Sequence, residues 1–223
     1  MIRMMMGCLG SIDPYTVLLL HMDGENGSTA FVDSSPYARA VTAAGGVEQS
    51  TARAKFGAAS SLHDGDSDYL VVTGIAPGTG AFCIEMWVYI TTSDAANYVV
   101  SYGGTNETAT SGFAAKVTDA FTFYASAARI TATALSLNAW HHIAIVGNGG
   151  ANGSRTIKLY SDGNQAGSTY TTDYNYTGKD LWIGANEDSG GQCLFGHIDE
   201  VRISIGTERY TGSFTPPAAP FAG

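Results

Sequence analysis

Residues Ala81–Ile90 have the sequence AFCIEMWVYI, in which two sets of side chains alternate. Successive side chains of a β-strand point to opposite faces of its sheet, so alternate residues share a face. One set is Phe82, Ile84, Met86, Val88 and Ile90, and the other is Cys83, Glu85, Trp87 and Tyr89. A period of two sustained over this length predicts a long β-strand.

The segments on both sides of this strand have the same character. Short apolar or alternating runs are separated by turns rich in Gly, Asn, Asp and Ser, and helical periodicity is hard to find beyond one turn near Thr207–Tyr210. Gly147–Gly153 and Asp162-Gly163 have the composition of hairpin turns. Further strands are expected at Tyr15–Met22, Ser60–Leu62, Tyr69–Thr73, Tyr98–Tyr102, Phe113–Val117, Phe121–Ala125, Trp140–Val146, Arg155–Ser161, Leu181–Ala185 and His197–Ser204. The sequence therefore predicts an all-β sandwich or barrel.

The length of 223 residues is compatible with one all-β domain, and no linker divides the chain. We expect this domain over residues 14–213. A flexible or anchoring tail would precede it over residues 1–13, and an extended tail rich in Pro and Ala would follow it over residues 214–223.

The composition argues against several classes of protein. The chain has 11 basic and 20 acidic residues, a net charge of −9 and no cluster of four Lys or Arg, so nucleic-acid binding is not expected. The apolar run Val17–Leu20 is far shorter than the roughly 20 residues that span a membrane. Met1–Gly10 is too short for a secretory signal. Because Cys8, Cys83 and Cys193 cannot form a closed set of disulfides, they indicate folding in a reducing compartment.

Short motifs follow one another in a fixed order over nearly the whole chain. They are Leu18–Gly24, Lys55–Gly57 with Ser60–Leu62, Gly65–Leu70, Phe82–Val88, Trp140–Ala144, Leu159–Gly163, Leu181–Gly184 and Gly196–Ile203. In this order they resemble the laminin-G-like branch of the concanavalin A-like lectin/glucanase superfamily. The resemblance implies a jelly roll, so the expected fold is a two-sheet antiparallel jelly-roll sandwich with one concave sheet.

The two ends of the chain carry a narrower likeness. Asp23–Thr29 with Phe31–Ser35 is similar to the opening of laminin-G-like modules in bacteriophage virion proteins, and Arg209–Pro217 is similar to their close. The likeness implies a non-enzymatic structural or adhesion module, such as a head decoration, fibre or tail component.

On this hypothesis the partners are other virion proteins of the capsid or tail, with a host-surface glycan as a further candidate. The protein would be made in the host bacterial cytoplasm without a signal peptide, residues 1–13 would anchor it to the virion, and a homo-oligomer would be compatible with that position. The alternative is a free bacterial carbohydrate-binding lectin module.

The sequence lacks the residue patterns of an enzyme. The glucanases of the superfamily resemble one another in a Glu-x-Asp-x-x-Glu strand motif that supplies two carboxylates, whereas none of the Glu residues here has an Asp two positions later. His141 and His142 are neighbours on a strand and face opposite sides, so they cannot act together. Zinc, P-loop and nucleophile-elbow motifs are also absent, and we expect no catalytic residues.

Calcium is the one ion that the sequence favours, because it prefers several oxygen ligands. The resemblance implies a structural calcium ion between the first loop and the acidic pair near the end, with Asp23, Ser28 and Asp199 as ligands. Alternation places Asp199 on the same face as Val201 and Ile203, where a carboxylate needs a partner. The alternative is that Asp199 accepts backbone N–H bonds or pairs with an Arg.

The segment Tyr170–Tyr176 has the composition of a ligand-binding loop. Aromatic faces stack on the apolar faces of sugars, and nearby polar groups orient the hydroxyls. Because the segment falls between predicted strands, some of its tyrosines are expected to be exposed. The candidate ligand-binding residues are Tyr170, Asp173, Tyr174 and Tyr176, with protein contact and plain packing as alternatives. Core positions are expected for Trp87, Trp140 and Trp182.

Overall fold

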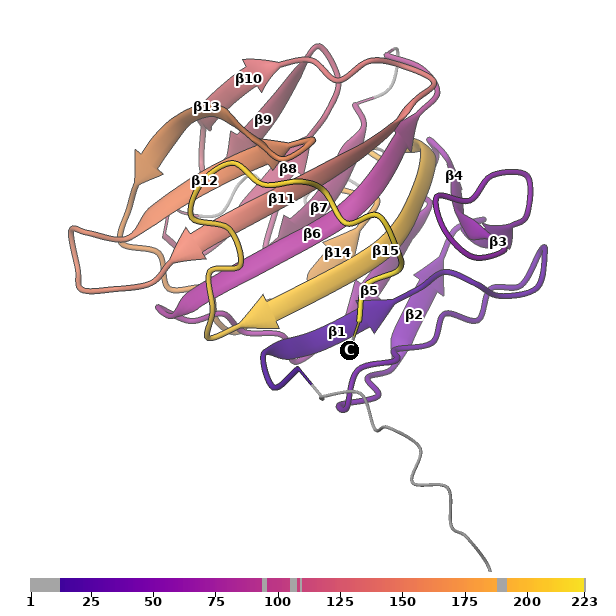
Figure 1. The fold of residues 1–223 in the computed structure, drawn as a ribbon, viewed down its shortest axis with the longest axis horizontal. Helices are drawn as coiled ribbons and strands as arrows, with labels where there is room; N and C mark the ends of the chain where they lie inside the picture. The colour runs from indigo at the N-terminus through magenta and orange to yellow at the C-terminus, as the bar shows by residue number, and fades with distance from the viewer. Residues whose placement is uncertain (1–12, 94–95, 105–107, 109, 188–191, 223) are drawn as a thin grey trace, which may run out of the picture.

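The computed structural model describes residues 13–93, 96–104, 108, 110–187 and 192–222. These residues form an 8-stranded and a 7-stranded sheet, and neighbouring strands pair antiparallel throughout (Figure 1). The described residues contain no helix, so Thr207–Tyr210 does not form the expected helical turn. The prediction of an all-β, two-sheet antiparallel jelly roll is confirmed.

The larger sheet has the strand order β13 (Asn164–Thr171), β12 (Thr156–Ser161), β11 (Trp140–Asn148), β6 (Ala81–Ile90), β15 (Phe195–Ile205), β4 (Ser60–Asp64) and β3 (Glu48–Ser50), with β1 (Thr16–Leu20) also paired to β15. The smaller sheet has the order β10 (Ala128–Thr133), β9 (Ala120–Tyr124), β8 (Phe113–Lys116), β7 (Tyr98–Tyr102), β14 (Leu181–Ile183), β5 (Tyr69–Val72) and β2 (Val41–Ala44). In the described part of the chain, no helix is long and apolar enough to cross a membrane.

The predicted strand at residues 81–90 is β6, near the centre of the larger sheet. It pairs with β11 on one side and β15 on the other. Its five alternating apolar side chains, from Phe82 to Ile90, belong to the core between the two sheets. Removing these apolar surfaces from water is the main contribution of this strand to stability.

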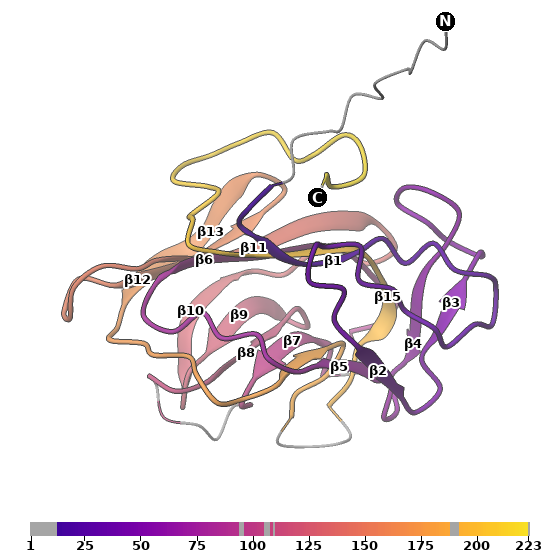
Figure 2. The same ribbon diagram turned by 90° about the horizontal axis from the view of Figure 1, so that it is seen from below.

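The outer face of the larger sheet is covered as well. Figure 2 shows the C-terminal segment (residues 207–222) lying across this sheet on the side away from the smaller sheet. Tyr210 and Phe214 stack with ring centroids 3.5 Å apart and pack against Tyr160. Phe221 is 4% exposed and packs with Leu19 and Trp87. The segment has no regular secondary structure, yet it is anchored to the domain at both ends.

The tail predicted over residues 1–13 lies outside the described residues except for Asp13. Asp13 caps the start of β1 by accepting hydrogen bonds from Tyr15 N and Thr16 Oγ1 at 3.0 and 2.9 Å. It also pairs with Arg209 of the C-terminal segment. The two ends of the described chain therefore meet on the outer face of the larger sheet.

The prediction that the tryptophans occupy core positions is confirmed for Trp87, which is buried in a small hydrophobic cluster, and is wrong for Trp140 and Trp182, which are half-buried. Trp87 is 6% exposed, but it lies on the outer face of the larger sheet, with Trp140 half-buried nearby. Trp182 is half-buried on the outer face of the smaller sheet and stacks on Tyr69, with ring centroids 4.2 Å apart. In each strand the residues that alternate with the tryptophan fill the core instead.

The segment Tyr170–Tyr176 does not present its tyrosines to solvent as expected. Tyr174 and Tyr176 are fully buried, stack on each other at 5.0 Å and pack edge-on against Phe82. Tyr170 is half-buried against the same core, and Asp173 is exposed and accepts a hydrogen bond from Gly153 N in a hairpin loop. The buried rings have no free face for a sugar, so the alternative of plain packing describes Tyr174 and Tyr176.

The two stacked tyrosines differ only in how their hydroxyls are satisfied. The Tyr174 hydroxyl donates to Gly80 O at 3.0 Å and accepts from Gly149 N at 2.7 Å, whereas the buried Tyr176 hydroxyl has no partner among the described residues. We expect Tyr174→Phe to lower the free energy of unfolding by about 1–3 kcal/mol, because it leaves the buried backbone N–H of Gly149 unpaired. Tyr176→Phe is expected to be neutral or stabilising. Urea denaturation of both variants measures the difference, and equal losses would contradict it.

Candidate functional site

An irregularity in β15 determines where the late acidic pair points. Asp199 pairs with Trp87 and Arg202 pairs with Glu85, with a shift of register between them. Glu200 lies in this bulge with a φ of 52°, a backbone region that non-glycine residues seldom occupy. Ile198 and Val201 consequently both enter the core, and Asp199 faces outward. The expectation that Asp199 shares a face with Val201 and Ile203 is therefore wrong.

Asp199 is buried although it lies on the outer face, because a loop of residues 53–59 covers it. Its Oδ2 accepts hydrogen bonds from Lys55 N at 2.6 Å and Phe56 N at 3.1 Å. Lys55 and Phe56 pack on Trp87, the residue opposite Asp199 in the sheet. The alternative prediction, that Asp199 accepts backbone N–H bonds, describes this carboxylate oxygen.

The second oxygen of Asp199 is the unusual feature. Oδ1 is buried and has no hydrogen-bond partner among the described residues. Burial raises the pKa of Asp199 to about 7, against the backbone hydrogen bonds that lower it. Near neutral pH a bound proton or a nearby cation would therefore stabilise this oxygen.

Asp23 fastens the other end of the same loop. Asp23 comes three residues after the end of β1 and directly after Met22, which has a φ of 59°. Its Oδ1 accepts hydrogen bonds from Ala58 N at 2.6 Å and Ala59 N at 3.3 Å. A Cβ at Gly57, where φ is +62°, would lie 2.1 Å from this oxygen, so only glycine lets the loop approach so closely.

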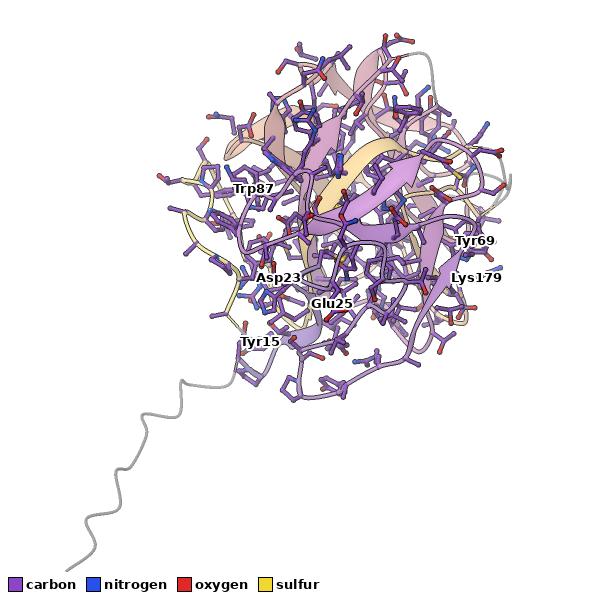
Figure 3. All side chains as sticks on the ribbon, turned by 90° about the vertical axis from the view of Figure 1, so that its right-hand side faces the viewer. Tyr15, Asp23, Glu25, Tyr69, Trp87 and Lys179 are labelled. Carbon is purple, nitrogen blue, oxygen red and sulfur yellow. The ribbon has the colours of Figure 1, made fainter. Side chains whose placement is uncertain are left out.

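Glu200 joins this region to the C-terminal segment. Its Oε1 contacts His21 Nδ1 at 2.8 Å, and its Oε2 accepts a hydrogen bond from Phe221 N at 2.7 Å. The hydrogen bond to Glu200 raises the pKa of His21, although partial burial opposes the shift. We call Asp23, Asp199 and Glu200 the acidic site. In Figure 3, Asp23 appears between Trp87 and Tyr15, with Tyr69 and Lys179 at the opposite side of the view.

The acidic site offers carboxylate oxygens, the kind of ligand that calcium prefers. The third predicted ligand, Ser28, is not bonded to the site within the described residues. Asp23 and Asp199 each hold the 53–59 loop with one oxygen. The other oxygen of Asp199 is buried without a partner among the described residues, whereas Asp23 is exposed. The hydroxyl of Ser28 accepts a hydrogen bond from Ala30 N and its carbonyl accepts one from Gln49 N, and no hydrogen bond among the described residues joins Ser28 to Asp23 or Asp199. The described residues contain no group of three or more His, Cys, Asp or Glu placed to hold a metal ion.

A second buried carboxylate lies at the centre of the larger sheet. Glu85 Oε1 contacts Arg202 Nη2 at 2.8 Å, and Oε2 accepts hydrogen bonds from Tyr210 at 2.6 Å and His142 Nε2 at 3.2 Å. Burial opposes ionisation of Glu85, but His142, Arg202 and Tyr210 outweigh it and hold the pKa below its usual range. His141 lies on the other face and contacts Asp162 at 2.7 Å, so the two histidines do not act together.

This arrangement makes Glu85 a structural anion. Hydrolysis by two carboxylates needs a second Asp or Glu across a gap that admits the substrate. The groups around Glu85 are the Arg202 guanidinium, the His142 imidazole and the Tyr210 phenol, and the C-terminal segment lies above them. Glu85 therefore ties Tyr210 to the sheet, and no second carboxylate of the described residues contacts Glu85.

The fold and these contacts define a laminin-G-like jelly-roll sandwich. A family model described as the concanavalin A-like lectin/glucanases superfamily matches residues 64–206, and the chain belongs to this superfamily. No curated protein sequence matches the chain.

Solved structures that are similar to this chain include a domain in complex with arabinotriose and receptor-binding domains of botulinum neurotoxins. Domain 4 of AbnA, a GH43 extracellular arabinanase from Geobacillus stearothermophilus solved with arabinotriose, is 15% identical with a TM-score of 0.59, covering 91% of this chain and 95% of that one. The botulinum neurotoxin type G receptor-binding domain is 13% identical with a TM-score of 0.61 over 88% of this chain, and the type DC domain with SialylT is 14% identical with a TM-score of 0.58 over 90%. This chain spans only 49% and 50% of those two toxin chains.

The hydrogen bond from Tyr210 to Glu85 gives a direct test of the anchored C-terminal segment. We expect Tyr210→Phe to lower the free energy of unfolding by about 1–3 kcal/mol, because it removes a short hydrogen bond to a buried charge. Tyr160→Phe is the matched control, since the Tyr160 hydroxyl makes only a 3.4 Å contact to a neutral carbonyl, Tyr210 O. Urea denaturation measures both variants, and a similar loss in each would count against the anchor.

Proposed function

We propose that this protein is a non-enzymatic adhesion module that binds glycans and acts as a structural component of a bacteriophage virion. The observation that carries the binding function is the jelly-roll fold of the lectin/glucanase superfamily. The non-enzymatic part is supported by Glu85, the central carboxylate, which is paired with protein groups. The fold provides a rigid platform, and the central carboxylate is occupied by Arg202, His142 and Tyr210. Such a platform can recognise a ligand but lacks the paired acids of a glycosidase at this point.

Two solved domains of this fold support a sugar as the ligand class. One of these domains was solved in complex with arabinotriose and the other in complex with SialylT. At about 15% identity the likeness is one of fold, so the sugar bound by this chain has to be measured. The virion role draws its support from the phage-like sequences at residues 23–35 and 209–217. Other virion proteins would then be the partners, and head, fibre and tail remain the candidate positions.

Two experiments test the proposal. We expect the purified full-length chain to bind glycans on an array and to leave the bound glycans uncleaved on prolonged incubation. Mass spectrometry of purified phage particles is expected to detect the chain at a stoichiometric copy number. Binding with no particle association would favour a free bacterial lectin. Release of reducing sugar would contradict a non-enzymatic module.

Calcium belongs to the same proposal as a structural ion. Asp23 and Asp199 would hold the ion, which would supply positive charge to two carboxylates that both fasten the 53–59 loop. Without a cation, Asp199 keeps a proton in the folded state up to a pKa of about 7, while the unfolded chain releases it near 3.8. The free energy of unfolding therefore falls as the pH rises between these two values.

The thermal midpoint should report this competition between proton and ion. We expect excess calcium chloride, compared with EDTA, to raise the midpoint more at about pH 8 than at about pH 5, because an ion bound only by the folded state stabilises it and protons compete at low pH. Asp199→Asn should abolish both the calcium response and the pH slope. Asp119→Asn, at an exposed site, is the control. An unchanged midpoint with calcium at the higher pH would rule out the ion.

A further inference from the structure

The sequence contains three Asn-Gly pairs, which begin at Asn26, Asn148 and Asn152. In such a pair the backbone nitrogen of the glycine lies close along the chain to the side-chain amide carbon of the asparagine, and glycine has no Cβ to obstruct their approach. The structure describes all three pairs. They differ in the groups that face the glycine N–H and the asparagine Oδ1.

The pair at Asn152 lies at the corner of the loop that joins β11 to β12. Ser154 N donates to Ala151 O at 3.2 Å, which closes the turn, and both Asn152 and Gly153 are exposed. Gly153 has a φ of +77°, and no heavy atom beyond its chain neighbours lies within 4 Å of where a Cβ would be. Water therefore reaches this pair, and the glycine has space to rotate.

A fixed cation faces the side-chain amide of Asn152. Arg155 is 7% exposed, and its Nε and Nη1 donate to Gly150 O and Tyr174 O at 3.1 Å each. The remaining nitrogen, Nη2, donates to Asn152 Oδ1 at 2.7 Å. A cation held in this position stabilises the negative charge that develops on an amide oxygen when a nucleophile attacks the carbonyl carbon.

A carboxylate faces the other group of the pair. Gly153 N donates a hydrogen bond to Asp173 Oδ1. Asp173 is exposed, but its neighbours Thr172 and Tyr174 are buried, and Thr172 N donates to Arg155 O at 2.9 Å, so the backbone that carries the carboxylate is held in place. A carboxylate in contact with an N–H can accept its proton as the nitrogen attacks, which is the role of a general base.

The pair at Asn148 has neutral groups at both positions. Gly149 N donates to the Tyr174 hydroxyl at 2.7 Å. Asn148 Oδ1 accepts a hydrogen bond from Thr156 N at 2.7 Å. A neutral phenol is a far weaker base than a carboxylate, and a backbone N–H brings no positive charge to the amide oxygen. Gly149 is also buried, which limits the access of water.

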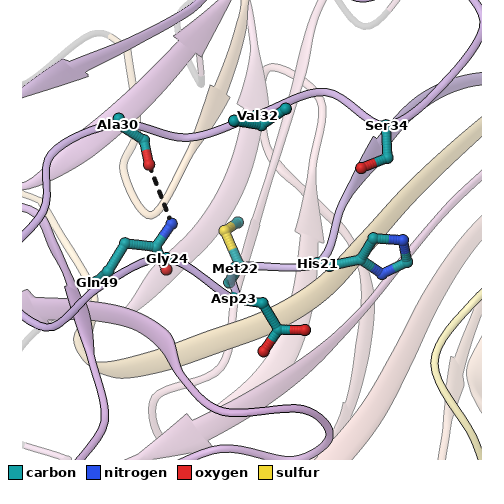
Figure 4. A pocket seen from close by; sticks show the side chains of 8 residues that line it. All are labelled: His21, Met22, Asp23, Gly24, Ala30, Val32, Ser34 and Gln49. Atoms are coloured by element: carbon teal, nitrogen blue, oxygen red, sulfur yellow. Dashed lines mark hydrogen bonds between the residues drawn. The ribbon is translucent and has the colours of Figure 1, made fainter.

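The pair at Asn26 is exposed, as the pair at Asn152 is, but its partners are neutral too. Gly27 N donates to Gln49 O at 2.8 Å, and Figure 4 shows the Gln49 side chain bonded to the end of the same loop. Asn26 Oδ1 accepts hydrogen bonds from Thr51 N and Oγ1 at 3.0 and 3.1 Å. Exposure therefore does not distinguish these two pairs, whereas the charges around them do.

We propose that Asn152 is a site of self-catalysed deamidation, promoted by Arg155 and Asp173. The Gly153 nitrogen forms a bond to Asn152 Cγ, and its proton passes to the Asp173 carboxylate. The electron pair of the C=O bond moves onto Oδ1 beside Arg155. Its return expels the side-chain nitrogen, which leaves as ammonia with the proton from Asp173. Water then opens the cyclic imide to aspartate or isoaspartate.

The net reaction consumes one water, releases one ammonia and adds one negative charge to the loop. The reaction requires no ligand and is independent of the proposed glycan-binding function. An aspartate at position 152 would place a carboxylate against the Arg155 guanidinium. An isoaspartate would lengthen the backbone at the corner of the turn.

Ageing of the full-length chain in neutral buffer tests the proposal, with peptide mass spectrometry following the imide and acid products at each pair. Water enriched in heavy oxygen marks the products formed before digestion. We expect conversion at Asn152 to be at least about tenfold faster than at Asn26 or Asn148. In urea the three pairs should convert at similar rates, because the fold creates the difference between them.

Asp173→Asn keeps a hydrogen-bond acceptor and removes the base, so it should slow conversion at Asn152 at least about tenfold. Glu25→Gln is the matched control, because it removes an exposed carboxylate next to the pair at Asn26, and it should leave all three rates unchanged. Circular dichroism establishes that each variant is folded. If Asp173→Asn is not folded, the comparison of Asn152 with Asn26 in the unmodified chain decides. Equal rates at these two positions in the folded chain, or an undiminished rate in folded Asp173→Asn, would overturn the proposal.

Discussion

Both faces of β6 are removed from water, and the rest of the structure is arranged around this constraint. The smaller sheet covers the inner face with apolar side chains. The outer face carries Glu85, whose burial is tolerable only with ionic and hydrogen-bonded partners. These partners come from β15, β11 and the C-terminal segment, through Arg202, His142 and Tyr210. A segment without regular secondary structure is thereby fastened to the centre of the sheet.

The bulge at Glu200 organises the other half of the outer face. One extra residue sends Asp199 to the 53–59 loop and lets Glu200 reach both His21 and Phe221. Met22 and Glu200 have strained, positive φ angles. In sequence they are the neighbours of Asp23 and Asp199, the two carboxylates that hold this loop. Backbone strain of this kind persists where surrounding contacts over-determine it, which is common at binding sites.

Most strands are predictable from the sequence, and the strands that the sequence did not predict lie at the edges of the two sheets. The strands not predicted are β2, β3 and β10, together with the extent of β13 after the Asp162-Gly163 turn, and these four strands form the edges of the two sheets. Edge strands are short or largely exposed here, so they lack the alternation that marks a strand with one buried face. The interior strands are buried at most of their positions, so their sequences show either a continuous apolar run or an alternation between a core face and a covered outer face.

The amino-acid sequence by itself determined the all-β class, the central strand with its two faces and the absence of a glucanase motif, since each depends on local spacing. The face of Asp199, the burial of Tyr174 and Tyr176 and the unpaired Oδ1 of Asp199 were decided only in three dimensions. A single bulge reverses the faces of all residues beyond it. Whether an atom is buried or hydrogen-bonded depends on the segments, distant in sequence, that pack against it. The spacing of residues along one strand carries no information about those segments.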